Sequence, residues 1–255
     1  MFETLNALVL REVRYKEADR ILTLLTDREG KITAKARGAL RKGSRLAAAT
    51  QQLTYSEMTL FGNRGRWSVN EAAVREGFDG LRGDMEKLAL AAYFAECAEA
   101  LSVEDQPEAE LLQLTLNCLY AVSRGLDAPE KIKAAFETRL MCIAGYTPAL
   151  TACAVCGKEP ADPFLSLDRG AVCCRACAGM GERCELGEEG LAAMRYLVSA
   201  PAKKLLSFTL PDSALPRLAD ASERYFLRRT ERGFSTLKYW KSLRAYTDPA
   251  PLPSP

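Results

Sequence analysis

The sequence predicts an α+β protein, with an N-terminal five-stranded OB-like β-barrel followed by an all-helical domain that carries an inserted four-cysteine zinc module. Three observations lead to this prediction. Short β-rich runs recur before residue 79, apolar residues then repeat at helical spacing, and two Cys-x-x-Cys pairs stand between helical segments.

The barrel is predicted from five strand-like runs separated by turn signals. The segments Asp27-Arg28-Glu29-Gly30 and Gly62-Asn63-Arg64-Gly65 are typical of hairpin turns. Five short strands in a segment of this size indicate a small barrel, although their spacing does not separate an OB-fold from an SH3-like barrel. The runs are residues 5–13, 20–26, 31–39, 53–61 and 66–74.

The hydrophobic period becomes helical after Phe78-Asp79-Gly80. The spacing predicts a helix capped by Asp84, a second helix through Leu111–Val122, a third that starts at Pro129, and further helices over 187–199 and 212–245. The expected divisions are a nucleic-acid-binding barrel (1–79), a helical bundle (80–150), the cysteine module (151–185), C-terminal helices packing on the helical domain (186–246) and a disordered proline-rich tail (247–255).

Composition excludes several kinds of chemistry. The 255 residues include no histidine, which removes Ser-His-Asp and Cys-His catalysis and histidine-based zinc sites. No run has the glycine spacing of a P-loop, and no apolar run approaches membrane length. The N-terminus lacks the basic and apolar regions of a signal peptide. We therefore expect a cytoplasmic protein with no membrane association and no recognisable active site.

Two Cys-x-x-Cys pairs give the most specific signal, Cys153 with Cys156 and Cys174 with Cys177. Four thiolates on two tight turns are the ligand set of one structural zinc ion, and four protein ligands leave no open position for catalysis. Two disulfides or a dithiol redox pair are the weaker interpretations for a protein in a reducing compartment. Cys173 adjoins Cys174 and could replace it as the third ligand, although Cys173 would break the two-residue spacing to Cys177.

Charge is segregated along the chain, although the net charge is only +2. Residues 1–70 hold 13 basic and 7 acidic residues, whereas residues 71–150 hold 7 basic and 14 acidic residues. Six cations occur without an acid between residues 31 and 45, and nucleic-acid phosphate is the natural partner of such a run. A solvated basic edge that protects a strand is the alternative. The candidate DNA-binding residues are Lys35, Arg37, Arg41, Lys42 and Arg45.

Other cations are secondary DNA-binding candidates, and for those near the C-terminus a solvated helix face is an equal alternative. Trp67 and Phe61 could stack on bases, though one aromatic residue per barrel strand is more often part of the core. The secondary candidates are Arg14, Lys16, Arg224, Arg228 and Arg232.

Four stretches of the sequence carry a likeness to a known family. They are Val13-Arg14-Tyr15-Lys16-Glu17-Ala18-Asp19-Arg20-Ile21-Leu22, Lys35-Ala36-Arg37-Gly38-Ala39 with Ser44-Arg45, Cys153-Ala154-Val155-Cys156-Gly157 and Phe234-Ser235-Thr236-Leu237. These features, in this order, resemble the RecO family of bacterial recombination mediators, over essentially residues 1–245. The chain departs from the family in the doublet Cys173-Cys174, in an extra Cys184, and in Arg229-Thr230-Glu231, where members often have His-Leu-Gly.

The resemblance implies a non-enzymatic, nucleoid-associated DNA repair protein that binds single- and double-stranded DNA and anneals complementary strands. It further implies assistance to RecA loading on DNA covered by single-strand-binding protein (SSB), with RecR and the acidic C-terminal tail of SSB as partners. A zinc-ribbon thiol redox protein and an RNA-binding OB protein remain the alternatives. An acidic tail docking on the acidic middle segment would need a local cation, for which the candidates are Lys87, Arg124, Lys131, Lys133 and Arg139.

Overall fold

The computed structural model describes residues 1–63, 65–104, 106–177 and 179–247. The chain forms two compact units, of which the first contains Met1–Arg124 together with the segment from Phe234 onward. The second unit is Gly125–Gly233. The five-part division expected from the sequence stays a prediction, and its expected tail lies, from residue 248 on, outside the described residues.

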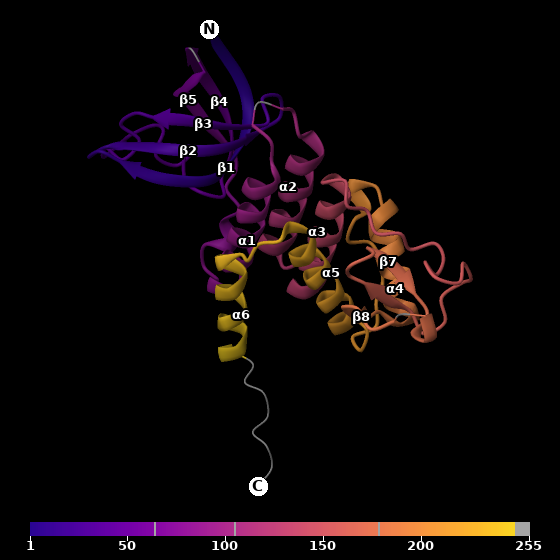
Figure 1. The fold of residues 1–255 in the computed structure, drawn as a ribbon. Helices are drawn as coiled ribbons and strands as arrows, with labels where there is room; N and C mark the ends of the chain where they lie inside the picture. The colour runs from indigo at the N-terminus through magenta and orange to yellow at the C-terminus, as the bar shows by residue number, and fades with distance from the viewer. Residues whose placement is uncertain (64, 105, 178, 248–255) are drawn as a thin grey trace. The chain divides into compact units, whose positions relative to one another are not determined.

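The first unit contains the barrel, and all five predicted strands are confirmed (Figure 1). The barrel closes in the order β1-β2-β3-β5-β4, with a parallel contact between β3 and β5 that pairs Ala34 with Trp67 and Lys35 with Ser68. This closed five-stranded arrangement agrees with the predicted OB-like fold. The strands are β1 (Phe2–Tyr15), β2 (Asp19–Thr26), β3 (Lys31–Ala36), β4 (Tyr55–Asn63) and β5 (Arg66–Glu76).

Two strand ends differ from the sequence-based expectation, and each coincides with a left-handed backbone residue. Strand β3 ends at Ala36 rather than at residue 39, before Gly38 with a φ of +66°. Strand β4 begins at Tyr55 rather than at residue 53, after Leu53 with a φ of +62°. The alternation of apolar residues still holds, because every second side chain points into the barrel. The interior includes Leu5, Val9, Leu22, Leu24, Ile32, Met58 and Leu60.

Three helices complete the first unit: α1 (Met85–Leu101), α2 (Ala109–Arg124) and α6 (Ser235–Thr247). A short 3₁₀ turn, η1 (Asp79–Leu81), precedes α1. Asp84 caps α1 as predicted, since its carboxylate accepts the backbone N–H groups of residues 86 and 87. Helix α6 lies alongside α1, although the two are far apart in the sequence (Figure 1). Tyr93 meets Phe234 edge to face with ring centroids 5.8 Å apart, and Arg244 pairs with Glu86 at 2.6 Å.

The second unit packs α3 (Pro129–Ile143) against α4 (Gly187–Ser199) and α5 (Leu215–Thr230). Its small sheet has the order β7-β6-β8. The single helix predicted over 212–245 is wrong, because the chain forms α5 and α6 with a break between them. Glu231 adopts a φ of +50°, which ends α5. The remaining elements are β6 (Phe164–Ser166), β7 (Ala171–Cys173), η2 (Arg175–Cys177), β8 (Arg183–Glu185) and η3 (Ala202–Lys204).

A buried ion-pair network joins α3 to α5. The Lys133 side chain is 2% exposed and lies 2.9 Å from Glu137 and 2.8 Å from Glu223, and Ser222 donates its hydroxyl to Glu137. Burial alone would lower the pKa of Lys133, but the two carboxylates outweigh it and raise that pKa. Lys133 is therefore charged and enclosed.

No helix in the described part of the chain combines the length and apolarity needed to cross a membrane.

Candidate nucleic-acid interface and metal centre

The basic loop, residues 37–45, leaves β3 beside the turn between β1 and β2. The Asp19 carboxylate accepts the backbone N–H of Gly38 at 2.8 Å, and the backbone N–H of Leu40 donates to the carbonyl of Ala18 at 2.9 Å. Further along the chain, the buried Arg20 guanidinium donates to the carbonyl of Ala47 and to the Thr50 hydroxyl, at 2.9 and 2.8 Å. The turn thus holds both flanks of the basic loop in place.

The sequence-based reasoning assigned no role to Asp19 and Arg20. Asp19 also pairs with Lys35 at 2.9 Å, and hydrogen bonds from Lys35 and from the Gly38 amide lower the pKa of the Asp19 carboxyl. Asp19 therefore stays ionised at neutral pH. A signal was present, because an acid and a base adjoin a predicted turn, but the partners that hold the basic loop lie 16 to 30 residues further along the chain.

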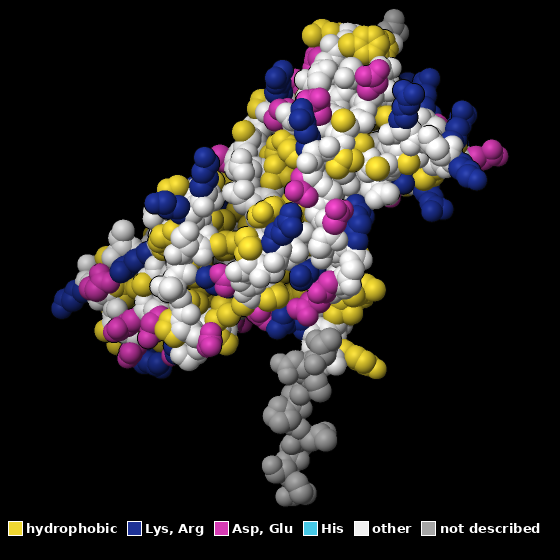
Figure 2. All heavy atoms as spheres, turned by 180° about the vertical axis from the view of Figure 1, so that it is seen from behind, with side chains coloured by type: hydrophobic (Ala, Val, Ile, Leu, Met, Phe, Trp, Pro, Cys, Tyr) yellow, Lys and Arg dark blue, Asp and Glu magenta, His cyan; other side chains and the backbone are white. Residues whose placement is uncertain are grey.

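The predicted cations divide into two groups. Lys35 is occupied by Asp19, and Lys31, on the same face of β3, donates to the backbone carbonyl of Glu99. The other four are exposed and make no ion pair within the described residues, so their charges can meet an external anion. Figure 2 shows Lys and Arg side chains gathered over the barrel. These four are Arg37, Arg41, Lys42 and Arg45.

The secondary candidates lie in both units. Arg14 and Lys16 are exposed next to the β1–β2 turn. In the second unit, Arg224 pairs with Asp220 at 3.6 Å and Arg228 with Asp168 at 2.6 Å, and Arg232 is exposed between α5 and α6. The pairing with Asp168 raises the pKa of Arg228.

The two aromatic residues considered for base stacking have partners of their own. Trp67 packs against the barrel core, where its ring covers Gly62. Phe61 contacts Phe2, with ring centroids 5.0 Å apart. The Trp67 ring therefore packs within the barrel, whereas the Phe2–Phe61 pair stays partly exposed.

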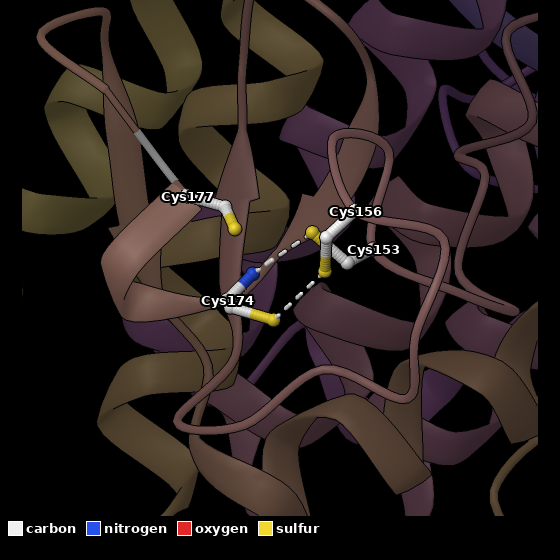
Figure 3. Close-up of side chains that lie close together, drawn as sticks. All are labelled: Cys153, Cys156, Cys174 and Cys177. Atoms are coloured by element: carbon white, nitrogen blue, oxygen red, sulfur yellow. Dashed lines mark hydrogen bonds between the residues drawn. The ribbon is translucent and has the colours of Figure 1, made fainter.

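The four cysteines of the two pairs form one cluster in the second unit (Figure 3). Their sulfur atoms all lie within 4.8 Å of one another, and those of Cys156 and Cys174 are 3.9 Å apart. Tetrahedral zinc with Zn–S bonds of about 2.3 Å requires sulfurs about 3.8 Å apart, so this arrangement fits a metal ion with little movement.

Local backbone geometry explains how the first pair, Cys153 and Cys156, presents its sulfurs. The backbone N–H of Gly157, which has a φ of +72°, donates to the carbonyl of Cys153, and Cys153 in turn donates its N–H to the carbonyl of Lys158. Backbone amides of Cys156, Cys174 and Val155 point at the Cys153 sulfur and lower the pKa of its thiol to about 6. The turn therefore favours the thiolate, which is the form that binds metal.

The remaining cysteines are not members of the cluster, although Cys173 lies next to Cys153, and burial together with this neighbour raises the pKa of the Cys173 thiol. The structure groups Cys174, not Cys173, with the other three sulfurs, and Cys173 is buried in β7. Cys97 and Cys118 are fully buried in α1 and α2. Burial raises the pKa of Cys118, as expected for a thiol in an apolar core.

Most of the cations considered as contacts for an acidic SSB tail already have partners within this chain. Lys133 is enclosed by its carboxylates, Lys131 pairs with Asp127, and Arg139 donates to the carbonyl of Val198. Lys87 is half-buried at the start of α1, and Arg124 is exposed at the end of α2. These last two remain the better candidates, and both belong to the first unit.

The fold and the sites define a class of protein that combines an OB-like barrel and a helical part with a cluster of four cysteines that could hold a metal ion. Comparison with known families identifies the class further. The family model for the N-terminal part of recombination protein O matches residues 1–78, and the model for its C-terminal part matches residues 82–238. The chain belongs to the RecO family.

Curated relatives agree with this assignment over nearly the whole chain. A DNA repair protein RecO from Acetivibrio thermocellus is 36% identical over 240 residues, covering 93% of this chain and 96% of the relative. The protein of the same name from Symbiobacterium thermophilum is 32% identical over 251 residues, covering 94% and 97%. A third, from Desulfitobacterium hafniense, is 33% identical over 231 residues, covering 88% and 84%.

Proposed function

We propose that this RecO family protein is a non-enzymatic DNA repair and recombination mediator that binds single- and double-stranded DNA in the cytoplasm, at the nucleoid. The basic loop is the observation that carries the proposal. Four exposed cations stand on a segment that Asp19 and Arg20 hold at both flanks. Such a surface contacts phosphates and positions a strand without reading its sequence.

The same surface supports strand annealing. Two complementary strands repel each other through their phosphates, and cations that neutralise those phosphates lower this barrier. Because Arg37, Arg41, Lys42 and Arg45 are exposed and form no ion pair in the described structure, their charges are available for this task. Lys35 contributes less, since Asp19 already offsets it.

The proposal includes assistance to RecA loading on SSB-coated DNA, with RecR and the SSB tail as partners. The SSB tail is acidic, so Lys87 and Arg124 are its proposed contacts in the first unit. Fluorescence anisotropy with a labelled tail peptide tests this part, with Lys87→Ala and Arg124→Ala as variants. No saturable binding at low salt would remove the partner from the proposal.

We propose that the four-cysteine cluster holds one structural zinc ion. Four sulfurs in one cluster favour a closed metal site over a pair of redox-active thiols. The surrounding residues 151–185 hold 4 basic and 5 acidic residues, which makes the module a poor surface for phosphate. A closed site should contain one zinc per chain and leave five of the nine cysteines titratable by thiol reagents.

The decisive experiment is annealing of complementary oligonucleotides, with and without SSB. The protein should accelerate pairing of naked strands and of SSB-coated strands. The test variant is Arg37→Ala/Lys42→Ala/Arg45→Ala, which should slow both reactions. Binding of an RNA strand in strong preference to the same DNA sequence would instead support the RNA-binding alternative.

A further inference from the structure

Tyr15 is an exposed aromatic residue at the end of β1, and two cations lie close to its ring. Its side chain is 43% exposed. The Lys35 ammonium lies 4.8 Å from the ring centroid and the Lys16 ammonium lies 5.6 Å from it. An exposed aromatic ring with ammonium groups close to it suits a nucleotide, which offers a flat base and an adjacent phosphate.

The position of this ring is fixed by the contacts that hold the basic loop. Tyr15 is paired across the β1–β2 ladder with Asp19, whose carboxylate binds both Lys35 and the backbone N–H of Gly38. Lys16 turns the chain with a φ of +54°. The ring therefore stands where the basic loop begins, and the Lys35 ammonium is held against it by the same carboxylate.

The other aromatic residues considered on the barrel do not share this environment. Trp67 packs on the barrel core, and Phe2 and Phe61 contact each other. Among the described residues of the barrel, Tyr15 combines an exposed ring with two neighbouring ammonium groups.

We propose that Tyr15 is a base-stacking residue that makes this surface prefer single-stranded over double-stranded DNA. The inference rests on the proposed DNA-binding function and deepens it. Phosphates are available in both forms of DNA, so the cations of the basic loop serve both. The base faces of a duplex are already covered by neighbouring bases, so an aromatic side chain adds affinity only for a strand whose bases are free.

The test compares affinities for oligo-dT and for a hairpin duplex, by fluorescence anisotropy at several salt concentrations. Tyr15→Ala and Tyr15→Thr remove the ring, and threonine keeps a high strand propensity at this position. Both should weaken oligo-dT binding at least about fivefold and duplex binding less than about twofold. The salt slope should not change, because no cation is lost. Tyr15→Phe should bind oligo-dT within about twofold of the parent.

Tyr239→Ala is a matched control, because Tyr239 is similarly exposed, at 49%, but lies on α6. It should leave both affinities unchanged. An equal loss on single strands and duplex, or no loss in folded Tyr15→Ala and Tyr15→Thr, would overturn the stacking role while leaving the basic loop as the DNA surface. A parent protein that binds neither form of DNA would overturn the proposed function itself.

Discussion

Replacing three cations of the basic loop, as Arg37→Ala/Lys42→Ala/Arg45→Ala, should reduce DNA binding in a salt-dependent way. All three side chains are exposed and form no ion pair in the described structure, although the charge of Arg37 helps to lower the pKa of the Asp19 carboxyl. Their removal therefore breaks no ion pair, and the free energy of unfolding should change little. The effect should fall on phosphate contacts alone.

The expected magnitude follows from counterion release. Each phosphate neutralised on a single strand contributes about −0.7 to the slope of log affinity against log salt, so the loss of three contacts should flatten the slope by roughly 2 units. The ratio of parental to variant affinity should therefore be about 20-fold larger at about 50 mM salt than at about 200 mM salt. Anisotropy titrations with labelled oligonucleotides of several sequences measure both quantities, and the loss should be alike for all sequences.

Lys31→Gln is the matched control, since it also removes a cation from the same stretch. The Lys31 ammonium already donates to the backbone carbonyl of Glu99, so it should make no phosphate contact and this variant should keep the parental slope. A folded triple variant with an unaltered slope would refute the reasoning. The DNA surface would then lie elsewhere, with the arginines of α5 as the next candidates.

Three further changes probe the rest of the molecule. Cys156→Ser should lower both the zinc content, measured by mass spectrometry, and the melting temperature, measured by calorimetry. A variant that keeps both but loses DNA binding would contradict a structural metal. Lys133→Met should lower the free energy of unfolding in urea by about 3 to 5 kcal/mol, because it removes the cation that the buried Glu137 faces. The double variant Lys133→Met/Glu137→Met should recover part of this loss. If Lys133→Met leaves the free energy of unfolding unchanged, the ion-pair network does not stabilise the fold. Gly30→Ala should cost at least about 2 kcal/mol, because its φ is +63° and its Cβ would lie 1.8 Å from a backbone carbonyl oxygen. Gly65→Ala, with a φ of +73° and open space, should cost less, and equal losses would show that the close approach at Gly30 is unimportant.

The sequence alone determined the features that depend on short-range patterns. Alternation of apolar residues placed the five strands, and the Asp84 cap and Pro129 marked two helix starts, because side-chain periodicity and terminal hydrogen bonds involve residues only a few positions apart. The cysteine spacing was equally informative. Two residues between ligands are what a tight turn needs to direct two sulfurs at one point, which is why the four predicted cysteines form the observed cluster.

Only the tertiary structure decided which charged residues are available. Lys31 and Arg37 look alike in the sequence, but Lys31 meets a carbonyl 68 residues away whereas Arg37 stays exposed. Lys133 carries a charge that composition would place at the surface, yet it is enclosed between α3 and α5. Asp19 and its neighbour acquire their role as supports of the basic loop only when the chain returns to the β1–β2 turn. Such pairings depend on long-range packing, which local composition and periodicity do not encode residue by residue.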